Sequence, residues 1–350
     1  MLPVRIPFRP RPPWLGGTLQ TLRAMAWPWP EPLPAGHRLW LPLPDGDALA
    51  AMLHWPEHPP PRPLAVLVHG MIGSEDDPHL REAAAGLLRR GFPVLRLNLR
   101  GNRRSRGRSR SHYHLGRVED LCDALGTLPP ALTEPGLLLA GWSLGGALAL
   151  RLLAEPPPGL RFIAGAAISP LLQPDQALAA IDAQPLFGRA LLARYRAEVL
   201  AVPATDLPDR LRRAAARARS LREFEADVTA PRFGYPSYEV FVEANRAALA
   251  LPQLRVPVLM LQAEDDPLVP ASGWQEVDWE ACPAVAPLLV AGGGHCGFYD
   301  GGAESLAVRA LGAFFAGAAD QAKGTGTPAA WEDFGTAPAF VARQAATPAS

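Results

Sequence analysis

The sequence contains little cysteine, no excess of charge of either sign and no long apolar segment. Its three cysteines, Cys122, Cys282 and Cys296, are odd in number and widely spaced. They match neither a disulfide framework nor a metal-binding motif, which favours a reducing compartment. The 34 basic and 34 acidic residues balance, so no overall field attracts nucleic acid or acidic lipid. No uninterrupted apolar run approaches the length of a membrane span.

Further absences narrow the expected function. Arginines and prolines interrupt the N-terminal segment, which therefore has no apolar core of a signal peptide, and we expect a cytoplasmic protein without stable insertion into a membrane. No metal-ligand spacing occurs. The glycines at 292–294 are not followed by the helix start and distal acid of a dinucleotide site. We therefore expect a protein that works without a metal or a cofactor.

Strand-like apolar runs alternate with segments of helical periodicity. The runs occupy about residues 64–69, 92–99, 137–142 and 161–169, and the helical segments between them occupy about 78–90, 117–128 and 144–154. This alternation is typical of a mostly parallel sheet flanked by helices, the α/β class. A β-hairpin is expected before it, because Asp45-Gly46 separates two strand-like runs at 38–43 and 48–55.

The α/β alternation stops after residue 169 and resumes near residue 256. The segment between is predicted to be mainly helical, at the sheet edge where ligand-covering elements occur. Strands are expected again at 256–263 and 286–291, and a helix at 303–315. The chain is thus divided into an irregular N-terminal arm at 1–36, a core formed by 37–169 and 256–316, a helical lid at 170–255, and a tail at 317–350 that is expected to be disordered because it lacks periodicity.

The most informative segment is Gly141-Trp142-Ser143-Leu144-Gly145, a G-x-S-x-G motif between an apolar strand and a helix. This order is typical of the nucleophile elbow of an α/β-hydrolase fold. Glycines flank the serine because the sharp turn brings backbones together where a Cβ would collide. The N-terminus of the following helix favours negative charge at the site. Ser143 is therefore the candidate nucleophile.

A serine nucleophile needs a base, and the base needs a third group to orient it. In α/β-hydrolases the acid precedes the histidine along the chain. His295 lies in a glycine-rich loop after the last predicted strand and is the candidate base. Glu264, Asp265 and Asp266 follow the preceding strand. Asp266 is the candidate acid, because a Pro-Leu-Val-Pro turn would fix its direction, and Asp265 is the alternative.

Acyl transfer also needs hydrogen-bond donors for the developing oxyanion. In α/β-hydrolases one donor is the backbone N–H of the residue after the nucleophile, and the other comes from the loop after an earlier strand of the sheet. Leu144 and Met71 are the corresponding candidates. His69, beside this loop, is interpreted as a structural residue rather than a second base.

Several further motifs accompany the elbow: Gln20-Thr21, Asn98-Leu99-Arg100-Gly101, Tyr113-His114-Leu115-Gly116, Arg222-Glu223-Phe224, Asp265-Asp266-Pro267 and Gly293-Gly294-His295-Cys296-Gly297-Phe298. Together they resemble the YheT-like group of α/β-hydrolases, from about residue 12 to residue 316. Thr18, Asn102 and Glu225 depart from the pattern of that group. The resemblance implies a carboxylic ester hydrolase for short-chain esters or acylglycerols, with Ser143, Asp266 and His295 as its triad.

The sequence therefore predicts a serine hydrolase that cleaves small or lipid-like carboxylic esters through an acyl-enzyme. Two alternatives are an acyltransferase with the same triad and a non-catalytic binding protein of the same fold. Six arginines between residues 100 and 110 are interpreted as a solvated loop rather than a nucleic-acid patch, because no aromatic residues interleave them. A further possibility is that one of these arginines reaches the pocket rim. No feature of the sequence predicts an oligomeric state.

Overall fold

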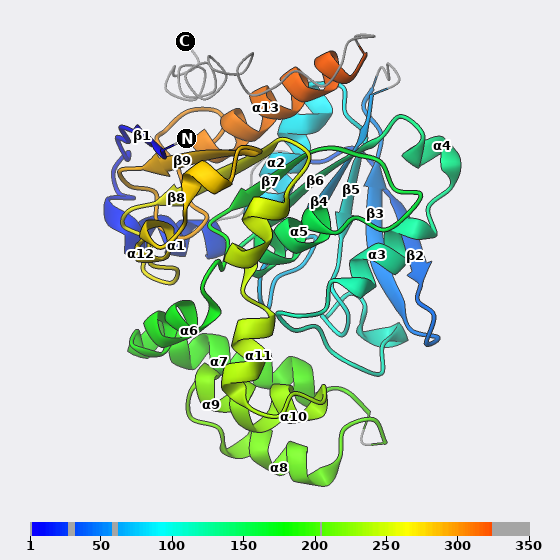
Figure 1. Ribbon diagram of the computed structural model, residues 1–350, viewed down its shortest axis with the longest axis vertical. Coiled ribbons are helices and arrows are strands. Elements are labelled where there is room, and N and C mark those ends of the chain that lie inside the picture. Colours follow the sequence, from blue (N-terminus) through cyan, green and yellow to red (C-terminus); the bar gives the residue numbers. More distant parts are fainter. Residues whose placement is uncertain (1, 27–31, 58–61, 204, 324–350) are drawn as a thin grey trace.

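The computed structural model describes residues 2–26, 32–57, 62–203 and 205–323 (Figure 1). Its strands are β1 (Val4–Ile6), β2 (His37–Pro42), β3 (Ala48–His54), β4 (Leu64–Val68), β5 (Val94–Leu97), β6 (Leu137–Trp142), β7 (Phe162–Ile168), β8 (Val258–Ala263) and β9 (Val285–Val290). The described residues form one nine-stranded sheet in the order β1-β9-β8-β7-β6-β4-β5-β3-β2. The hairpin strand β3 pairs antiparallel with β2 and β5, and the other described pairs are parallel. The predicted α/β class and the predicted hairpin are confirmed.

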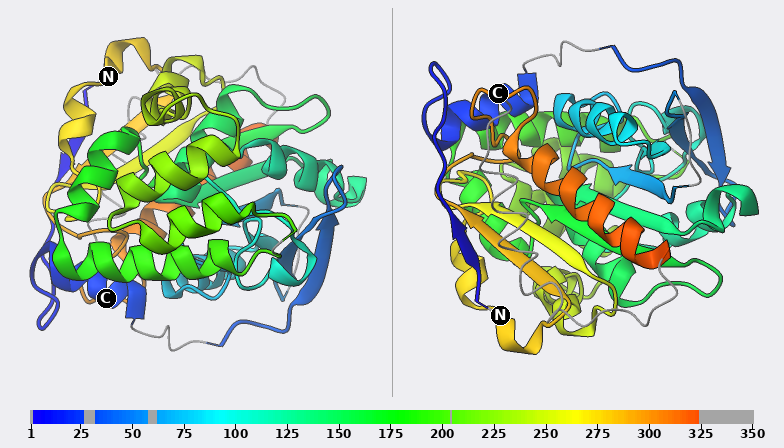
Figure 2. Two further views of the ribbon diagram at one scale, coloured as in Figure 1. Left: turned by 90° about the horizontal axis from the view of Figure 1, so that it is seen from below. Right: turned by 90° about the horizontal axis from the view of Figure 1, so that it is seen from above.

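Helices cover both faces of the sheet because the central strands are apolar on both faces. The helices of this core are α1 (Gly16–Ala26), α2 (Pro78–Arg89), α3 (Glu119–Gly126), α4 (Pro130–Thr133), α5 (Leu144–Ala154), α12 (Ser272–Gln275) and α13 (Leu306–Lys323), with 3-10 turns η1 (Arg106–Arg108) and η4 (Trp279–Ala281). On β6, Leu137 and Leu139 pack on the side of α3 and α5. Leu138 and Ala140 pack on the side of α2 and α13. Figure 2 shows α13 lying across the latter face.

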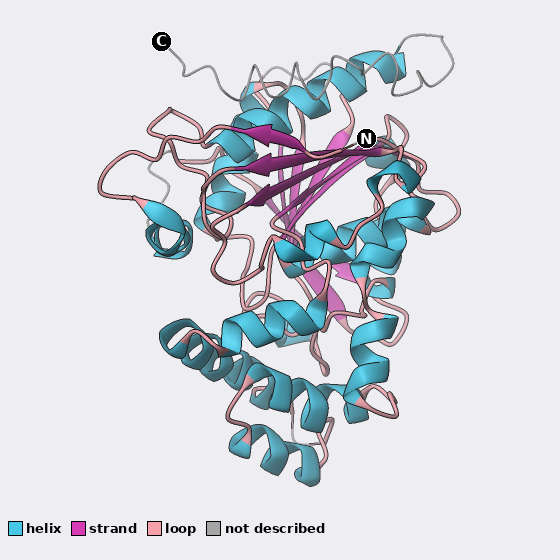
Figure 3. Cartoon of the chain, turned by 60° about the vertical axis from the view of Figure 1, so that its left-hand side comes forward, coloured by secondary structure: helices cyan, strands magenta, loops and turns pink. Residues whose placement is uncertain are grey.

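The chain between β7 and β8 is helical and gathers at one end of the sheet (Figures 1 and 3). It contains α6 (Pro174–Asp182), α7 (Pro185–Leu200), α8 (Asp209–Arg217), α9 (Leu221–Phe224), the π-helical turn η2 (Glu225–Thr229), α10 (Ala230–Arg232), α11 (Tyr238–Ala244) and the 3-10 helix η3 (Ala247–Gln253). We refer to residues 174–253 as the helical insertion. Its buried side chains, among them Tyr195, Phe224 and Phe241, belong to the same apolar cluster as α5. The insertion therefore packs on the core through side chains.

The N-terminal arm, expected to be irregular over residues 1–36, contains a strand and a helix. β1 extends the sheet parallel to β9, with Val4 opposite Leu288. The expectation of an irregular arm is wrong because a three-residue strand and a helix that begins with Gly-Gly give too little periodicity to recognise. The part of the arm at 27–31 lies outside the described residues.

The first part of the segment 317–350, which was expected to be a disordered tail, is helical. Helix α13 continues to Lys323 because Ala319, fully buried in the core, extends its apolar face. The expectation of disorder is therefore wrong for the first part of the tail. The rest of it, at 324–350, lies outside the described residues.

The arginine-rich stretch is not uniformly solvated, as the first side chain in it shows. Arg100 is 3% exposed and binds the carboxylate of Asp120 through two hydrogen bonds of 2.8 and 2.7 Å. Its Nη1 also contacts Asp45 at 2.6 Å and Asp47 at 2.5 Å. The expected solvated loop is thus wrong for Arg100, which joins the hairpin turn to α3 because three acidic partners surround it.

Replacing Arg100 by leucine is expected to lower the free energy of unfolding by about 3–5 kcal/mol, because the buried carboxylates of Asp47 and Asp120 would lose their main partner. Chemical denaturation measures the change. The matched control is Arg108→Leu, since Arg108 is exposed and contacts only the ring face of Trp40 in the described structure. The control substitution should lower the free energy of unfolding by no more than about 1 kcal/mol. Equal effects of the two variants would contradict this account of Arg100.

Candidate active site

The turn between β6 and α5 holds Ser143 in the left-handed region, at φ 56° and ψ −121°. Its two glycines are required by close backbone contacts. A Cβ on Gly141 would lie 2.1 Å from the carbonyl oxygen of Gly145, and a Cβ on Gly145 would lie 2.4 Å from the carbonyl oxygen of His69. Because neither position has room for a methyl group, the motif forms the sharp strand-to-helix turn that its sequence predicts.

His295 and Asp266 form a buried pair across the loops that follow β9 and β8. His295 Nδ1 lies 2.8 Å from Asp266 Oδ2, and the carboxylate has no exposed surface. The other oxygen, Oδ1, accepts hydrogen bonds from the N–H groups of Leu268 and Val269, both at 2.9 Å. A carboxylate held in this way accepts the Nδ1–H of the imidazole, which leaves Nε2 as the nitrogen available to a substrate or nucleophile.

The neighbouring carboxylate, Asp265, binds the backbone of the histidine loop instead of the imidazole. Its Oδ1 accepts a hydrogen bond of 2.8 Å from the N–H of Gly294 and so supports the backbone of the histidine loop. Of the two acids that the sequence left open, Asp266 is the one that contacts His295.

Neighbouring groups raise the pKa of His295. Burial lowers this pKa, but the carboxylate of Asp266 and the neighbouring Cys296 together raise it by more, so that it is well above the usual value of 6.5. The imidazolium form is therefore stabilised at this position, as a general base that must carry a proton during a reaction requires.

Helix α1 fixes the position of the histidine loop. Thr21 Oγ1 accepts a hydrogen bond of 2.8 Å from the N–H of His295. The side-chain amide of Gln20 bonds both the N–H and the carbonyl of Tyr299, each at 2.8 Å. The sequence alone assigned no role to Gln20 and Thr21. Both residues belong to a motif that carries the resemblance to the YheT-like group, and that motif was the signal that could have indicated their role.

The loop after β4 lies against Ser143. A Cβ on Gly70 would lie 3.0 Å from Ser143 Cβ. Within the residues that the structure describes, neither the N–H of Met71 nor that of Leu144 donates a hydrogen bond to the protein. These are the two backbone donors that the sequence predicts, and Met71 also lines the cavity that Ser143 lines.

His69 is part of the framework of this loop. It is fully buried, and burial lowers its pKa. Its Nε2 accepts hydrogen bonds of 3.0 Å from the N–H of Leu99 and the side-chain amide of Asn102, while Nδ1 lies 2.7 Å from the carbonyl oxygen of Gly70. Both ring nitrogens are thus occupied within the protein, which agrees with the structural interpretation of this histidine.

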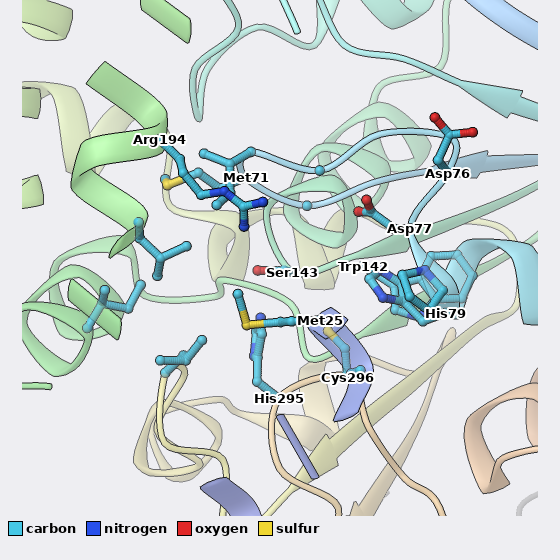
Figure 4. Close-up of a pocket in the computed structure, with 18 of the residues that line it drawn as sticks. Met25, Met71, Asp76, Asp77, His79, Trp142, Ser143, Arg194, His295 and Cys296 are labelled. Atoms are coloured by element: carbon cyan, nitrogen blue, oxygen red, sulfur yellow. The ribbon is translucent and has the colours of Figure 1, made fainter. Parts of the chain in front are cut away.

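Ser143 and His295 line one cavity of about 490 Å³, and Figure 4 shows both side chains facing it. One part of the wall is apolar, formed by Met25, Met71, Leu171, Ile181, Leu191 and Leu268. Another part is polar, with Asp76, Asp77, Arg103, Arg194 and Glu198. Arg103 shows that one member of the arginine-rich stretch does reach the cavity. The arrangement can hold a molecule with an apolar portion and place a polar group at the serine.

A family model described as alpha/beta hydrolase fold matches residues 63–302. The chain belongs to the alpha/beta hydrolase family. The E. coli (strain K12) protein YheT is 28% identical over 270 residues, which cover 75% of this chain and 78% of that protein. The medium-chain fatty acid ethyl ester synthase/esterase 2 of Saccharomyces cerevisiae is 28% identical over 283 residues, which cover 72% of this chain but only 62% of the yeast protein. The expected likeness to the YheT group is confirmed.

A solved member of the fold resembles this chain in three dimensions. Est1E from Butyrivibrio proteoclasticus, with ferulic acid bound, superposes with a TM-score of 0.51 at 20% identity, covering 80% of this chain and 98% of Est1E. At this identity the likeness concerns the fold alone. Among the described helices, none combines the length and the apolar character that crossing a bilayer requires.

The elbow geometry makes a substitution at Gly145 a specific test. Gly145→Ala should abolish reactivity at Ser143 and lower the free energy of unfolding by about 1–3 kcal/mol, because α5 must move away from the carbonyl of His69. Gly126→Ala on α3 is the control, since a Cβ there meets no atom within 4 Å. Thermal denaturation and the rate of modification by a serine-directed reagent measure both effects. Normal reactivity of Gly145→Ala would contradict this account of the elbow.

Proposed function

We propose that this alpha/beta hydrolase is a serine esterase that cleaves carboxylic esters through an acyl-enzyme, with Ser143, His295 and Asp266 as its triad. The observation that carries the proposal is the 2.8 Å contact between His295 and the buried carboxylate of Asp266, beside the cavity that Ser143 also lines. A serine, an imidazole and an oriented carboxylate in this order are the requirements for nucleophilic acyl transfer.

In the proposed reaction Ser143 Oγ attacks the ester carbonyl carbon while His295 Nε2 takes the hydroxyl proton. The carbonyl oxygen becomes an oxyanion, which the N–H groups of Met71 and Leu144 bind. The tetrahedral intermediate collapses, the C–O bond breaks, and His295 returns the proton to the leaving alcohol. Water, activated by the same imidazole, then releases the acid. Asp266 remains ionised throughout and stabilises the imidazolium.

The lining of the cavity favours an ester with an apolar acyl group, either small or lipid-like. Ile181 and Leu191 of its apolar wall come from the helical insertion. We therefore assign the insertion, within the predicted region 170–255, the role of a lid over the core formed by 37–169 and 256–316. A lid of this kind excludes water and strengthens electrostatic interactions at the serine.

Acyl transfer to an alcohol is a second candidate for the same triad. It is supported by the name of the yeast relative, which includes both ester synthase and esterase. Chromatography of products formed from p-nitrophenyl butyrate in the presence of ethanol distinguishes the two reactions. Ethyl butyrate would indicate transfer, and butyrate alone would indicate hydrolysis.

Ser143→Ala should lower kcat for p-nitrophenyl butyrate by at least about 10³-fold, because water cannot replace the aligned hydroxyl. The control is Ser272→Ala, an exposed serine that does not line the cavity. Initial rates of purified, folded proteins measure both. Undiminished turnover by Ser143→Ala would contradict the proposed nucleophile.

The pH dependence tests the His295–Asp266 pair. Only neutral imidazole accepts the proton of Ser143, so kcat/KM should increase as pH rises through the pKa of His295, which lies above 6.5. Asp266→Asn removes the charge that raises this pKa, while burial, which lowers it, remains. The acidic limb should therefore move to lower pH, and kcat should fall by about 10⁴-fold. An unchanged limb in the variant would mean that another group titrates.

A further inference from the structure

The oxyanion loop is joined to the helical insertion by two consecutive hydrogen bonds. The N–H of Ile72 donates to the hydroxyl oxygen of Tyr113 at 2.5 Å. The same hydroxyl donates to Oε2 of Glu198 at 2.9 Å. Ile72 follows Met71 directly, and Glu198 lies in α7 of the insertion. The hydroxyl of Tyr113 therefore connects a residue of the insertion to Ile72, the residue that follows a proposed oxyanion donor.

Ile72 needs such a partner because its backbone conformation is unfavourable. Its φ is 55°, in the left-handed region that a β-branched side chain rarely adopts. The hydrogen bond from the Ile72 N–H holds the Met71–Ile72 peptide plane, which adjoins, across the Cα of Met71, the peptide plane that carries the Met71 N–H. A strained residue persists only where its surroundings hold it, and the hydrogen bond to Tyr113 is a contact that can do so.

Tyr113 is itself held firmly in place. It is 1% exposed. Its ring packs edge-on against His69, with 6.3 Å between the ring centroids, and at a tilt against Tyr195, with 5.8 Å between the centroids. These contacts fix the ring, but they leave the hydroxyl hydrogen free to rotate. Glu198 removes that freedom, because it accepts the hydrogen and so directs a lone pair of the hydroxyl toward Ile72. Consecutive hydrogen bonds of this kind also polarise and strengthen one another.

We propose that Tyr113 and Glu198 are positioning residues that set the direction of the Met71 N–H, so that seating of the helical insertion completes the oxyanion hole. This inference rests on the proposed function of the site. It gives the insertion a second role besides covering the cavity. When α7 is seated, Glu198 reaches Tyr113 and the loop is held; when α7 is displaced, Tyr113 loses its acceptor and the strained loop is free to relax.

Three variants separate the hydrogen-bonding roles of the Tyr113 hydroxyl and the Glu198 carboxylate from the packing of these two side chains. Tyr113→Phe keeps the ring and removes the bond to Ile72. Glu198→Ala removes the acceptor. Glu198→Gln is the conservative replacement, because it retains an oxygen that can accept the hydrogen bond from Tyr113. Burial raises the pKa of Glu198 to about 7. An uncharged side chain is therefore already tolerated at this position near neutral pH. The control is Tyr238→Phe, which also breaks a hydroxyl–carboxylate bond in the insertion, 2.8 Å to Asp175, without touching the loop.

Steady-state kinetics with p-nitrophenyl butyrate should show a kcat about 10-fold to 100-fold lower for Tyr113→Phe, below the effect of deleting an oxyanion donor outright. KM should change by less than about twofold, since the loop binds the transition state rather than the ester. Glu198→Ala should shift kcat in the same direction, and Glu198→Gln should recover most of the kcat that Glu198→Ala loses, whereas Tyr238→Phe should remain close to wild type. Amide hydrogen exchange in the peptide that contains residues 69–74 should be faster in Tyr113→Phe than in Tyr238→Phe.

The outcomes separate this inference from the proposed function. Wild-type kcat together with unchanged exchange of the loop in Tyr113→Phe would overturn the inference alone, while the triad stands. A loss of kcat that Glu198→Gln shares fully with Glu198→Ala would overturn the role of Glu198 as a hydrogen-bond acceptor. A wild-type protein that hydrolyses no ester would overturn the proposed function, and with it the catalytic role given to Tyr113.

Discussion

The hydrogen bond between His295 and Asp266 is the interaction on which the site depends. It requires two loops that are 29 residues apart in the chain to meet without solvent between them. The sheet makes this possible, because β8 and β9 are neighbours and run parallel, so that both loops leave the same edge. β7 lies between β8 and β6, and β6 ends at Trp142, directly before Ser143, which brings the third loop to that edge. The order of strands thus brings three separate sequence motifs to one edge of the sheet.

Segments outside the central sheet then hold these loops in place. Helix α1 binds the histidine loop through Gln20 and Thr21, although β1 and α1 are the parts of the chain farthest from it in sequence. The helical insertion forms part of the cavity wall and is linked to the loop after β4 through Glu198 and the hydroxyl of Tyr113. The histidine loop and the loop after β4 are therefore each supported by an element outside the central sheet.

The sequence predicted the parts of the structure that depend on local pattern. The buried runs of β4 and β6, the Asp-Gly hairpin turn and the glycines around Ser143 each impose a structure through their own neighbours, and all appear as expected. The helical character of the insertion was likewise visible in its composition. These features need no knowledge of distant residues.

Features that depend on distant contacts were missed. Helix α1 buries the polar residues Gln20 and Thr21 and exposes Leu19 and Leu22, which is the reverse of an ordinary amphipathic pattern. Arg100 has the sequence surroundings of a solvated arginine, and its acidic partners are 20 to 55 residues away. Tyr113 and Glu198 are 85 residues apart, and no periodicity connects them. Long-range polar contacts of this kind become visible only in three dimensions.

The most direct test of the central claim is mass spectrometry of the protein after exposure to a fluorophosphonate, which forms a covalent bond with an activated serine. The account predicts one added phosphonyl group, located on Ser143, and a labelling rate that falls sharply in Asp266→Asn. An unlabelled Ser143 in the folded protein, or labelling at the same rate without the Asp266 carboxylate, would contradict it.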